Sequence, residues 1–566
     1  MINYVKNLRE EIVGLIKKAL EKSIRTEEFE NFELGDDEFV VEIPKEKTNG
    51  DFSTNIAMKM AKKARKAPRV CADIIIRNME IEGSNVDRVE CAGAGFINFY
   101  LKMDWLYDVL RIIQKEGCNY GKSNIGNGKK IMVEFVSANP TGPLHMGNAR
   151  GGALGDLIAG VFEATGHEVV REFYINDAGN QIEKFGVSLE ARYIQQIKGE
   201  DAISFPEDGY HGEDLIEHVK AYIEEYGDSL INVSEKERRK TLVDYALPRN
   251  INMIKEGLAR YGITYDVWFS EKTLHDSGEI KKVVKTLDDT GYCVDKDGAK
   301  WFKSPMLGDD KEAVLVRNNG VVTYFAADIA YHKNKFVDRG FDRVINLWGA
   351  DHHGHVARMK AGIAALGIDP DRLDIVLFQL VHLYQNGEKV RMSKRTGKAI
   401  SLIDLLDEVG KDAARFIFNT RASGNHLDFD LDLAVKKSND NPVYYVQYAY
   451  ARICSILRVC KEEGIVRVDL DKVDLSQLKN VEEIELIRAL ARYPEEIEIS
   501  LKTLEPSRLT RYVLDVAGLF HSFYNSCRIK DEEDTVRQAR LVLVESVKIV
   551  IKNVLDLLKI SAPEKM

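Results

Sequence analysis

Residues 129–175, KKIMVEFVSANPTGPLHMGNARGGALGDLIAGVFEATGHEVVREFYI, predict a strand, a helix and a second strand in one short span. The apolar run KKIMVEFV and the later HEVVREFYI have the branched and aromatic composition of strands. Between them, Leu154, Ile158 and Phe162 recur one turn apart, which is typical of a helix with one buried face. The order strand, helix, strand predicts a parallel sheet, with a crevice at the carboxyl ends of its strands.

The turn between the first strand and the helix is rich in glycine. Gly147, Gly151, Gly152 and Gly155 leave the start of the helix with few side chains. A base or a phosphate could then approach the backbone, and the first turn of the helix offers N–H groups and a partial positive charge. The alternative is that the glycines only allow the helix and the strand to pack closely.

The overall composition indicates a globular protein, with 45% apolar and 30% charged residues. A chain of 566 residues predicts about three or four domains. No apolar run approaches the roughly twenty residues that span a bilayer, and we expect no signal peptide and no membrane partner. Seven cysteines without a CxxC spacing argue against a disulfide framework and indicate the cytoplasm. Because the net charge is -10, a nucleic acid would have to bind a local basic surface.

Three regions differ in their patterns. Residues 1–118 alternate helix-like and strand-like runs and predict an α+β domain. Residues 119–437 repeat strand, loop and helix, with a polar, mostly helical insertion at about 190–300. Residues 438–566 keep helical spacing almost to the end, beginning with Asn441 as a helix cap. The expected fold class is α/β for the middle region, with an all-α C-terminal helical bundle.

A second loop contains basic side chains. The stretch EKVRMSKRTGKAISL, residues 388–402, carries Lys394 and Arg395 shortly after an apolar strand. The chain contains neither a GxxxxGK[ST] phosphate loop nor a GxGxxG dinucleotide motif. Instead, HMGN and RMSKR resemble the two signature motifs of class I aminoacyl-tRNA synthetases. Asn148 replaces the second histidine of the first motif and Arg391 the first lysine of the other, and both replacements keep a hydrogen-bond donor.

The resemblance narrows to the arginyl-tRNA synthetase family and covers nearly the whole chain. Matching segments occur in one order: GDFSTNIAM, AGAGFINF, ANPTGPLHMGNARGGALGD, YINDAGNQI, DGYHGEDL, TYFAADIAYHKNKF, WGADHHGH, MSKRTGK, DAARF, YYVQYAYARI and APEKM. This resemblance implies a Rossmann-like catalytic domain and an arginine-tRNA ligase. Such an enzyme converts arginine and ATP to arginyl-adenylate and pyrophosphate, then transfers arginine to the 3′-terminal adenosine of its tRNA.

Amino-acid activation is an in-line attack of a carboxylate on the α-phosphate of ATP. Negative charge spreads over the phosphoryl oxygens and the leaving pyrophosphate. The protein therefore mainly positions the two substrates and neutralises this charge. His145 and Asn148 can hydrogen-bond the phosphates beside Gly147, while Lys394 can follow the charge onto the leaving group. Mg²⁺ is expected to arrive with ATP, without a metal site built from protein ligands.

The segment WGADHHGH provides a second turn after a strand. Gly349 would admit the adenosine of ATP, and Asp351 can accept hydrogen bonds from ribose hydroxyls. Three histidines in the same segment also allow a zinc site: His352, His353 and His355. A complete ligand set with convincing spacing is missing, so we expect no metal.

Arginine recognition requires acceptors, because a guanidinium has five donors and no acceptor. The family's arginine contacts fall on Glu134, Asn139, Tyr324 and Asp328. Tyr324 and Asp328 are one helical turn apart and share a face. Without the resemblance, Glu134 would be interpreted as an outward residue of an edge strand and Asp328 as a solvated helix residue.

Both ends of the chain are expected to bind tRNA. The stretch AMKMAKKARKAPR predicts one helix. Four of its lysines would form a cationic stripe along that helix: Lys59, Lys62, Lys63 and Lys66. The alternative is that these lysines only face solvent. By resemblance, the N-terminal domain touches the corner of the tRNA and the C-terminal bundle holds the anticodon. Tyr444, Tyr448 and Tyr450 are candidates for stacking or for the core.

The sequence therefore predicts a monomeric ligase for arginine tRNA, arginine and ATP. Within the class, the alternative is a cysteinyl-tRNA synthetase, which shares the helical C-terminal module but requires cysteine and histidine zinc ligands. Outside enzymes, the alternative is a silent tRNA-binding paralogue. His145 and Lys394 argue against such a paralogue.

Overall fold

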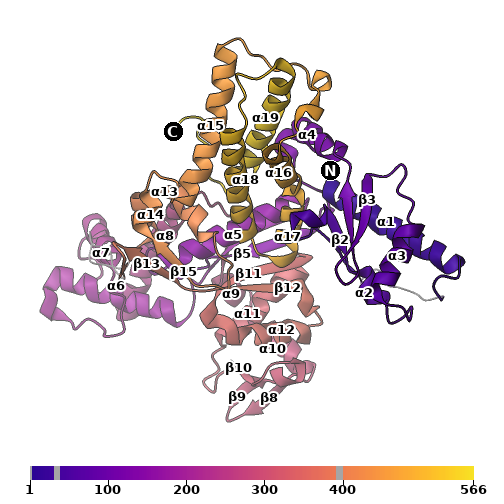
Figure 1. Cartoon of the computed structure of the whole chain (residues 1–566). Coiled ribbons are helices and arrows are strands. Elements are labelled where there is room, and N and C mark those ends of the chain that lie inside the picture. Colours follow the sequence, from indigo (N-terminus) through magenta and orange to yellow (C-terminus); the bar gives the residue numbers. More distant parts are fainter. Residues whose placement is uncertain (1–2, 31–38, 391–399) are drawn as a thin grey trace.

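A five-stranded parallel sheet forms the centre of the computed structural model, which describes residues 3–30, 39–390 and 400–566 (Figure 1). The strand order is β12-β11-β5-β6-β7. The strands are β5 (Lys130–Glu134), β6 (Glu168–Ile175), β7 (Val267–Ser270), β11 (Arg343–Gly349) and β12 (Leu373–Phe378). Helix α5 (Met146–Ala164) connects β5 to β6, which confirms the predicted strand, helix, strand unit.

The strand order places β5 at a topological switch point. From β5 the chain moves to β6 and β7 on one side, then returns to add β11 and β12 on the other. All four neighbouring pairs are parallel. The loops after β5 and β11 consequently diverge at the carboxyl edge of the sheet, where open α/β sheets bind ligands.

The region before the sheet is an α+β unit, as predicted. Its four-stranded sheet has the order β1-β2-β4-β3. Its elements are α1 (Tyr4–Arg25), β1 (Val41–Glu42), β2 (Phe52–Thr54), α2 (Ile56–Met60), α3 (Pro68–Asn78), β3 (Val86–Ala92), β4 (Phe96–Leu101) and α4 (Asp104–Glu116).

The single helix predicted for AMKMAKKARKAPR is wrong. Helix α2 ends at Met60, the chain turns through residues 61–67, and α3 begins at Pro68. Arg65 has a φ of 51°, a left-handed conformation that interrupts a helix. The lysines after Met60 therefore belong to a turn and do not form a helical stripe.

The polar stretch predicted as one insertion consists of two parts separated by β7. Helices α6 (Asn180–Lys198), α7 (Glu213–Tyr226) and α8 (Glu235–Arg260) form the first part, on the opposite side of the molecule from the N-terminal region (Figure 1). The second part contains α9 (Lys272–Asp276), α10 (Glu279–Asp289), β8 (Cys293–Lys296), β9 (Ala299–Phe302) and β10 (Ala313–Val316). Because β7 pairs with β6, the range 190–300 includes a strand of the main sheet.

Two further helices and a π-helical turn lie near the sheet: α11 (Tyr324–Lys333), η6 (Asn334–Asp338) and α12 (Val356–Ala365). The chain then forms β13 (Val381–Gln385), β14 (Glu388–Val390), α13 (Leu402–Phe418), β15 (Leu427–Asp430) and α14 (Leu431–Val435). The predicted C-terminal helices follow as α15 (Pro442–Glu462), α16 (Val481–Ala491), α17 (Tyr493–Thr503), α18 (Ser507–Ser526) and α19 (Asp534–Leu557). Asn441 caps α15 by accepting from the backbone of Val443, as predicted.

A buried ion network joins the helical bundle to α5. The carboxylate of Asp156, on α5, accepts from Arg415 of α13 at 2.6 Å, Lys559 at 2.8 Å and Arg171 of β6 at 3.0 Å. Arg415 also donates to the carbonyl of Leu558, just after α19. Burial opposes ionisation, but the three cations lower the pKa of Asp156. We call these residues the Asp156 network.

Candidate functional site

The N-terminus of α5 begins at the switch point of the sheet. His145 is its N-cap residue, and the side-chain oxygen of Asn148 accepts from the backbone N–H of His145 at 3.0 Å. This bond fixes the start of the helix and leaves the Asn148 amide nitrogen as a donor. His145 and Gly147 are exposed at this end of the helix, where N–H groups and the helix dipole favour an anion.

The four glycines in the first part of α5 have different surroundings. A Cβ atom on Gly151 would lie 2.9 Å from Phe378, one on Gly152 would lie 2.9 Å from Ile263, and one on Gly155 would overlap Phe135. These three glycines serve close packing, which was the alternative explanation for the group. A Cβ on Gly147 would meet nothing within 4 Å, so packing does not explain this glycine.

The segment that follows the basic loop, from Ile400 onward, is hydrogen-bonded through its backbone to the turn before α5. Met146 donates its backbone N–H to the carbonyl of Ile400 at 3.4 Å, and Leu402 donates to the carbonyl of Leu144 at 2.8 Å. His145 and Ser401 form an isolated antiparallel bridge. Lys394, Arg395 and Arg391 lie outside the described residues. The described end of their loop nevertheless contacts the helix N-terminus.

The end of β11 is adjacent to this turn. Val344, Ile345 and Asn346 of β11 pair with β5, and the strand ends at Gly349. A Cβ on Gly349 would overlap the Asp351 carboxylate, so a larger residue would displace that side chain. Asp351 is the second residue of a short 3-10 turn (Ala350–His355), and its side chain is 82% exposed.

The histidines of the same turn do not assemble a metal site with the acidic side chains near them. His352 lies 3.5 Å from the Asp351 carboxylate, and its ring is 5.8 Å from that of His355. Burial and the nearby Arg358 lower the pKa of His355. Among the described residues, no group of three or more His, Cys, Asp or Glu side chains is arranged to hold a metal ion.

Glu134, the last residue of β5, is buried and already has partners. Its carboxylate contacts the Lys335 ammonium at 2.5 Å and accepts from the Ser137 hydroxyl at 3.0 Å. Because β5 is a central strand, the interpretation of Glu134 as an outward residue of an edge strand is wrong. The carboxylate lies at the carboxyl end of the sheet, where a ligand could reach it.

Asp328 lies on α11 in an acidic environment. Enclosure by protein atoms raises the pKa of Asp328 to about 8, with further contributions from the carboxylates of Glu271 and Glu134, while Lys335 acts in the opposite direction. Glu271 directly follows β7 and is 2% exposed. Burial also raises the pKa of Glu271. These three carboxylates, at the ends of β5 and β7 and on α11, are near enough to influence the ionisation of Asp328, and we call them the acidic pocket: Glu134, Glu271 and Asp328.

Two further candidates lie at the same edge of the sheet. Tyr324 is the first residue of α11, is 43% exposed, and approaches the loop after β6: a Cβ on Gly179 would lie 3.2 Å from its hydroxyl. Asn139, in the loop before α5, accepts from the Asn176 amide at 3.1 Å. The loop after β6 therefore contacts both residues.

Sequence reasoning missed Glu271 and Lys335. Glu271 follows a strand of the same parallel sheet as Glu134, and this position at the carboxyl edge was a usable signal. Lys335 is seven residues after Asp328, so two helical turns connect them in the sequence. That spacing alone could not reveal its complete burial or its contact with Glu134.

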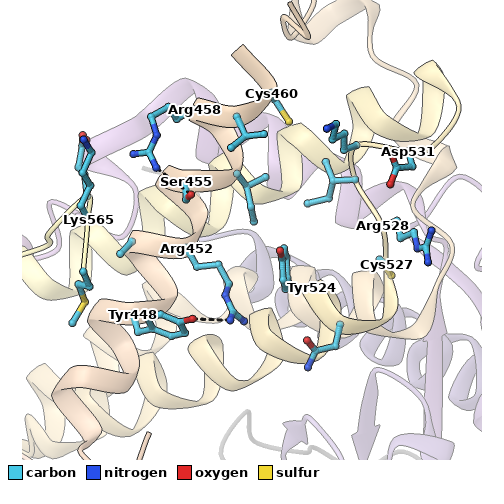
Figure 2. Close-up of a pocket in the computed structure, with 18 residues that line it drawn as sticks. Tyr448, Arg452, Ser455, Arg458, Cys460, Tyr524, Cys527, Arg528, Asp531 and Lys565 are labelled. Carbon is cyan, nitrogen blue, oxygen red and sulfur yellow. Dashed lines mark hydrogen bonds between the residues drawn. The ribbon is translucent and has the colours of Figure 1, made fainter. Parts of the chain in front are cut away.

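A cavity of about 860 Å³ lies at the far end of the helical bundle (Figure 2). Its wall includes α15, α18, the loop after α18 and the last three residues of the chain. Arg452 donates to the Tyr448 hydroxyl at 2.8 Å and lies 4.9 Å from the centre of the Tyr524 ring. Figure 2 shows the side chains of Tyr448 and Tyr524 on either side of Arg452. Arg458, Arg528, Lys530 and Lys565 add positive charge.

The three tyrosines named from the sequence have different environments. Tyr448 lines the cavity, and Tyr444 stacks on it with ring centres 6.0 Å apart. Tyr450 is 4% exposed and belongs to the core. Lys59, Lys62, Lys63 and Lys66 are exposed in the N-terminal α+β unit, away from the parallel sheet.

Family models match three successive parts of the chain. The model described as "Arginyl tRNA synthetase N terminal domain" matches residues 10–101. "tRNA synthetases class I (R), catalytic domain" matches residues 109–427, and "DALR anticodon binding domain" matches residues 446–566. The middle match contains α5 and the acidic pocket, and the last one contains the cavity of Figure 2.

Curated proteins match the whole chain, and solved structures match most or nearly all of it. Proteins named arginine–tRNA ligase from Acetivibrio thermocellus and Ruminiclostridium cellulolyticum are 65% and 62% identical over 566 residues, covering 100% of each chain. A structure titled as a putative arginyl-tRNA synthetase from Campylobacter jejuni is 33% identical, with a TM-score of 0.75, over 82% of this chain and 100% of that one. A Thermus thermophilus arginyl-tRNA synthetase shares the fold at 21% identity and a TM-score of 0.74, over 99% and 100%.

Proposed function

The chain belongs to the arginyl-tRNA synthetase family, and on that premise we propose how its residues divide the reaction. The protein is an arginine-tRNA ligase: it activates arginine with ATP and transfers it to tRNA. The observation that carries the assignment of residues is the acidic pocket, which lies at the same edge of the sheet as the N-terminus of α5. A guanidinium would bind in the pocket and phosphates at the helix.

ATP binds as its magnesium complex at the turn of α5. His145 and the Asn148 amide nitrogen donate to phosphate oxygens, and Gly147 keeps the helix N-terminus open. Gly349 and Asp351 hold the adenosine and its ribose. Lys394 supplies positive charge to the leaving pyrophosphate, because its loop is followed by residues that bond to this turn.

Arginine binds between β5 and α11. Asp328, Glu134 and Glu271 surround the guanidinium, with Tyr324 closing the pocket from the loop side. Asn139 holds the α-amino or carboxylate end near the phosphates. In the transition state, negative charge grows on the phosphoryl oxygens while the acidic pocket holds the far end of arginine, so the two charges are kept apart.

Arginine binding should weaken as pH falls. The pKa of Asp328 is raised to about 8 before arginine arrives, and the guanidinium needs the ionised form. Below that pH a proton must leave Asp328 for arginine to bind, so the dissociation constant should rise by up to about tenfold per pH unit. The affinity for arginine, measured by calorimetry with tRNA present between about pH 6 and 8, should follow this slope with proton release.

ATP affinity provides the control for this pH dependence. ATP does not contact Asp328, so its dissociation constant should not follow the same slope. An arginine affinity that stays constant across the range, with no proton released, would contradict the ionisation of Asp328 on binding.

The cavity of the helical bundle holds an unpaired base of the tRNA anticodon. Tyr448 and Tyr524 offer aromatic faces, and Arg452 lies between them with its guanidinium directed at both rings. Stacking on aromatic and guanidinium planes is the usual mode of binding for unpaired bases. The surrounding basic side chains would attract the phosphates.

Arg452→Ala should raise the KM for tRNA by about tenfold, because stacking contributes roughly 1 to 3 kcal/mol per base. The KM values for arginine and ATP, measured at saturating tRNA, should change little. Arg508→Ala is a matched control, since Arg508 is on α18 outside the cavity and pairs with Glu496 at 2.8 Å. Equal KM values for tRNA in the two variants would exclude the cavity as the base site.

One assay tests the whole assignment. Pyrophosphate exchange is measured with each of the twenty amino acids, with and without arginine tRNA. Of the twenty, only arginine should support exchange. Exchange with cysteine, or no exchange with any amino acid, would favour the alternatives that the sequence allowed.

We also propose that the enzyme acts as a monomer in the cytoplasm. All seven cysteines are free, which suits a reducing compartment. No helix in the described part of the chain has the length and apolar character to cross a membrane.

A further inference from the structure

Lys335 is a fully buried cation in the wall of the acidic pocket. It lies in η6, the π-helical turn that continues α11, and is 0% exposed. Its ammonium contacts the Glu134 carboxylate at 2.5 Å, donates to the Asn346 side-chain oxygen at 3.1 Å, and lies 4.0 Å from the centre of the Tyr331 ring. A buried ammonium is energetically costly unless it is paired, so Lys335 requires these partners to remain charged in the interior.

The same contacts continue to the backbone of Asp328. Asn346, on β11, donates its amide N–H to His332 Nε2 at 2.8 Å. His332 Nδ1 in turn donates to the carbonyl of Asp328 at 2.7 Å, and burial with the nearby Lys335 keeps the pKa of His332 well below its usual value. A neutral histidine with a defined tautomer thus connects the two acidic residues through Asn346.

The charges around Asp328 come from several elements. Glu134 is on β5, Glu271 precedes α9, and Lys335 is on η6. Asp177 and His275 adjoin Glu271, with His275 3.4 Å from its carboxylate. Glu172 is a separate case, because Arg339 and the Tyr331 hydroxyl satisfy it. The pocket therefore has three facing carboxylates and one built-in cation.

We propose that Lys335 is a positioning residue that fixes Glu134 and balances one of the three carboxylates, which leaves two carboxylates to face the single guanidinium of arginine. This inference rests on the proposed arginine contacts of Glu134 and Asp328. Lysine suits this role because its charge is compact, whereas an arginine fork needs more space and more acceptors than the buried position offers.

Loss of Lys335 has a consequence that depends on pH. Without the ammonium, three carboxylates would face one another, and like charges favour protonation. Near neutral pH, arginine would have to displace more protons and would bind less well. At alkaline pH the carboxylates would ionise anyway, and the removed cation would no longer oppose the guanidinium.

Lys335→Met should therefore raise the KM for arginine at pH 7 by about tenfold. The acidic limb in the plot of arginine KM against pH should move to a pH about one unit higher. At saturating arginine, kcat should stay within about threefold. Near pH 9 the KM should return to the value of the unmodified enzyme. A merely structural role would instead raise KM by a similar factor at every pH.

Lys335→Met should lower the KM for arginine, instead of raising it, when Glu134 has already been replaced by glutamine. In Glu134→Gln the buried ammonium has lost its carboxylate and repels the incoming guanidinium, so KM for arginine should rise at every pH. Adding Lys335→Met removes the repulsion and should recover about tenfold of the loss. This double variant leaves no unpaired charge in the wall, so it also decides the question if Lys335→Met alone fails to fold.

Asn346→Ala separates orientation from charge. It removes an acceptor of Lys335 and keeps the ammonium, so KM for arginine should rise modestly while the pH limb stays in place. The proposal would be overturned if Lys335→Met folds and the acidic limb of its arginine KM profile does not shift. It would also be overturned if the double variant has the same KM for arginine as Glu134→Gln. If Glu134→Gln itself leaves KM for arginine unchanged, the arginine site assigned above is wrong and this inference falls with it.

Discussion

Asp328→Asn is expected to lower kcat/KM for arginine by roughly thirtyfold to several thousandfold, while ATP affinity stays near normal. Removing one member of a buried charged pair costs roughly 2 to 5 kcal/mol, because the other charge loses its partner, and each 1.4 kcal/mol is about tenfold. The amide keeps the shape of the side chain and cannot ionise. Steady-state kinetics with saturating ATP and tRNA would measure the loss.

Citrulline tests the same residue from the ligand side. Its urea group offers an acceptor where arginine has a donor, so the amide introduced by Asp328→Asn could pair with it and discrimination should narrow. Asp338→Asn is the matched control, since Asp338 ends η6 and pairs with Lys333 at the surface. An unchanged kcat/KM for arginine would show that Asp328 has no contact with the substrate.

Lys394→Ala should reduce the rate of arginine activation by about a hundredfold or more, the scale seen when one transition-state donor is removed. Arginine affinity should change little, because the role proposed for the lysine concerns the leaving pyrophosphate and not the guanidinium. Single-turnover formation of arginyl-adenylate, with arginine binding measured separately, would distinguish the two effects.

Lys389→Ala is the comparison for this loop. Lys389 is exposed on β14, just before the loop, and should have almost no effect on the rate. If arginine binding collapsed in Lys394→Ala while the rate at saturation survived, Lys394 would belong to the ground-state binding site instead.

The sequence predicted the parallel sheet well because local signals agreed with the tertiary fold. Residues 129–175 combine branched strands, a helix with one buried face and a turn at a ligand edge, and each part formed as predicted. The C-terminal helices followed from their spacing for the same reason. Asn441 capped its helix because an asparagine side chain can accept from the first free N–H groups.

The predictions that failed depended on contacts across the fold. A run of helix-forming residues around Lys62 could not reveal the left-handed Arg65 that ends α2. Strand β7 has only four residues, and its pairing with β6 decides that it belongs to the main sheet. Likewise, three of the α5 glycines proved to be packing residues because of Phe378, Ile263 and Phe135, which come from other segments.

The acidic pocket shows the same limit. Glu134 and Asp328 were named by resemblance, yet neither their mutual electrostatic influence nor the pairing of Glu134 with Lys335 follows from spacing. These features arise because β5, β11 and α11 meet in three dimensions. Only the structure shows that a buried cation, Lys335, already pairs with Glu134 in this pocket.

The Asp156 network has a consequence for how the molecule comes apart. Asp156 is on the helix that presents His145, while Arg415 and Lys559 come from segments next to the bundle, and Lys559 precedes the chain end at the cavity by seven residues. Pulling the bundle away from α5 would leave a buried carboxylate without its cations, which is strongly unfavourable. The helical bundle and α5, the helix proposed to bind ATP, should therefore form one cooperative unit of unfolding and should gain and lose hydrogen-exchange protection together.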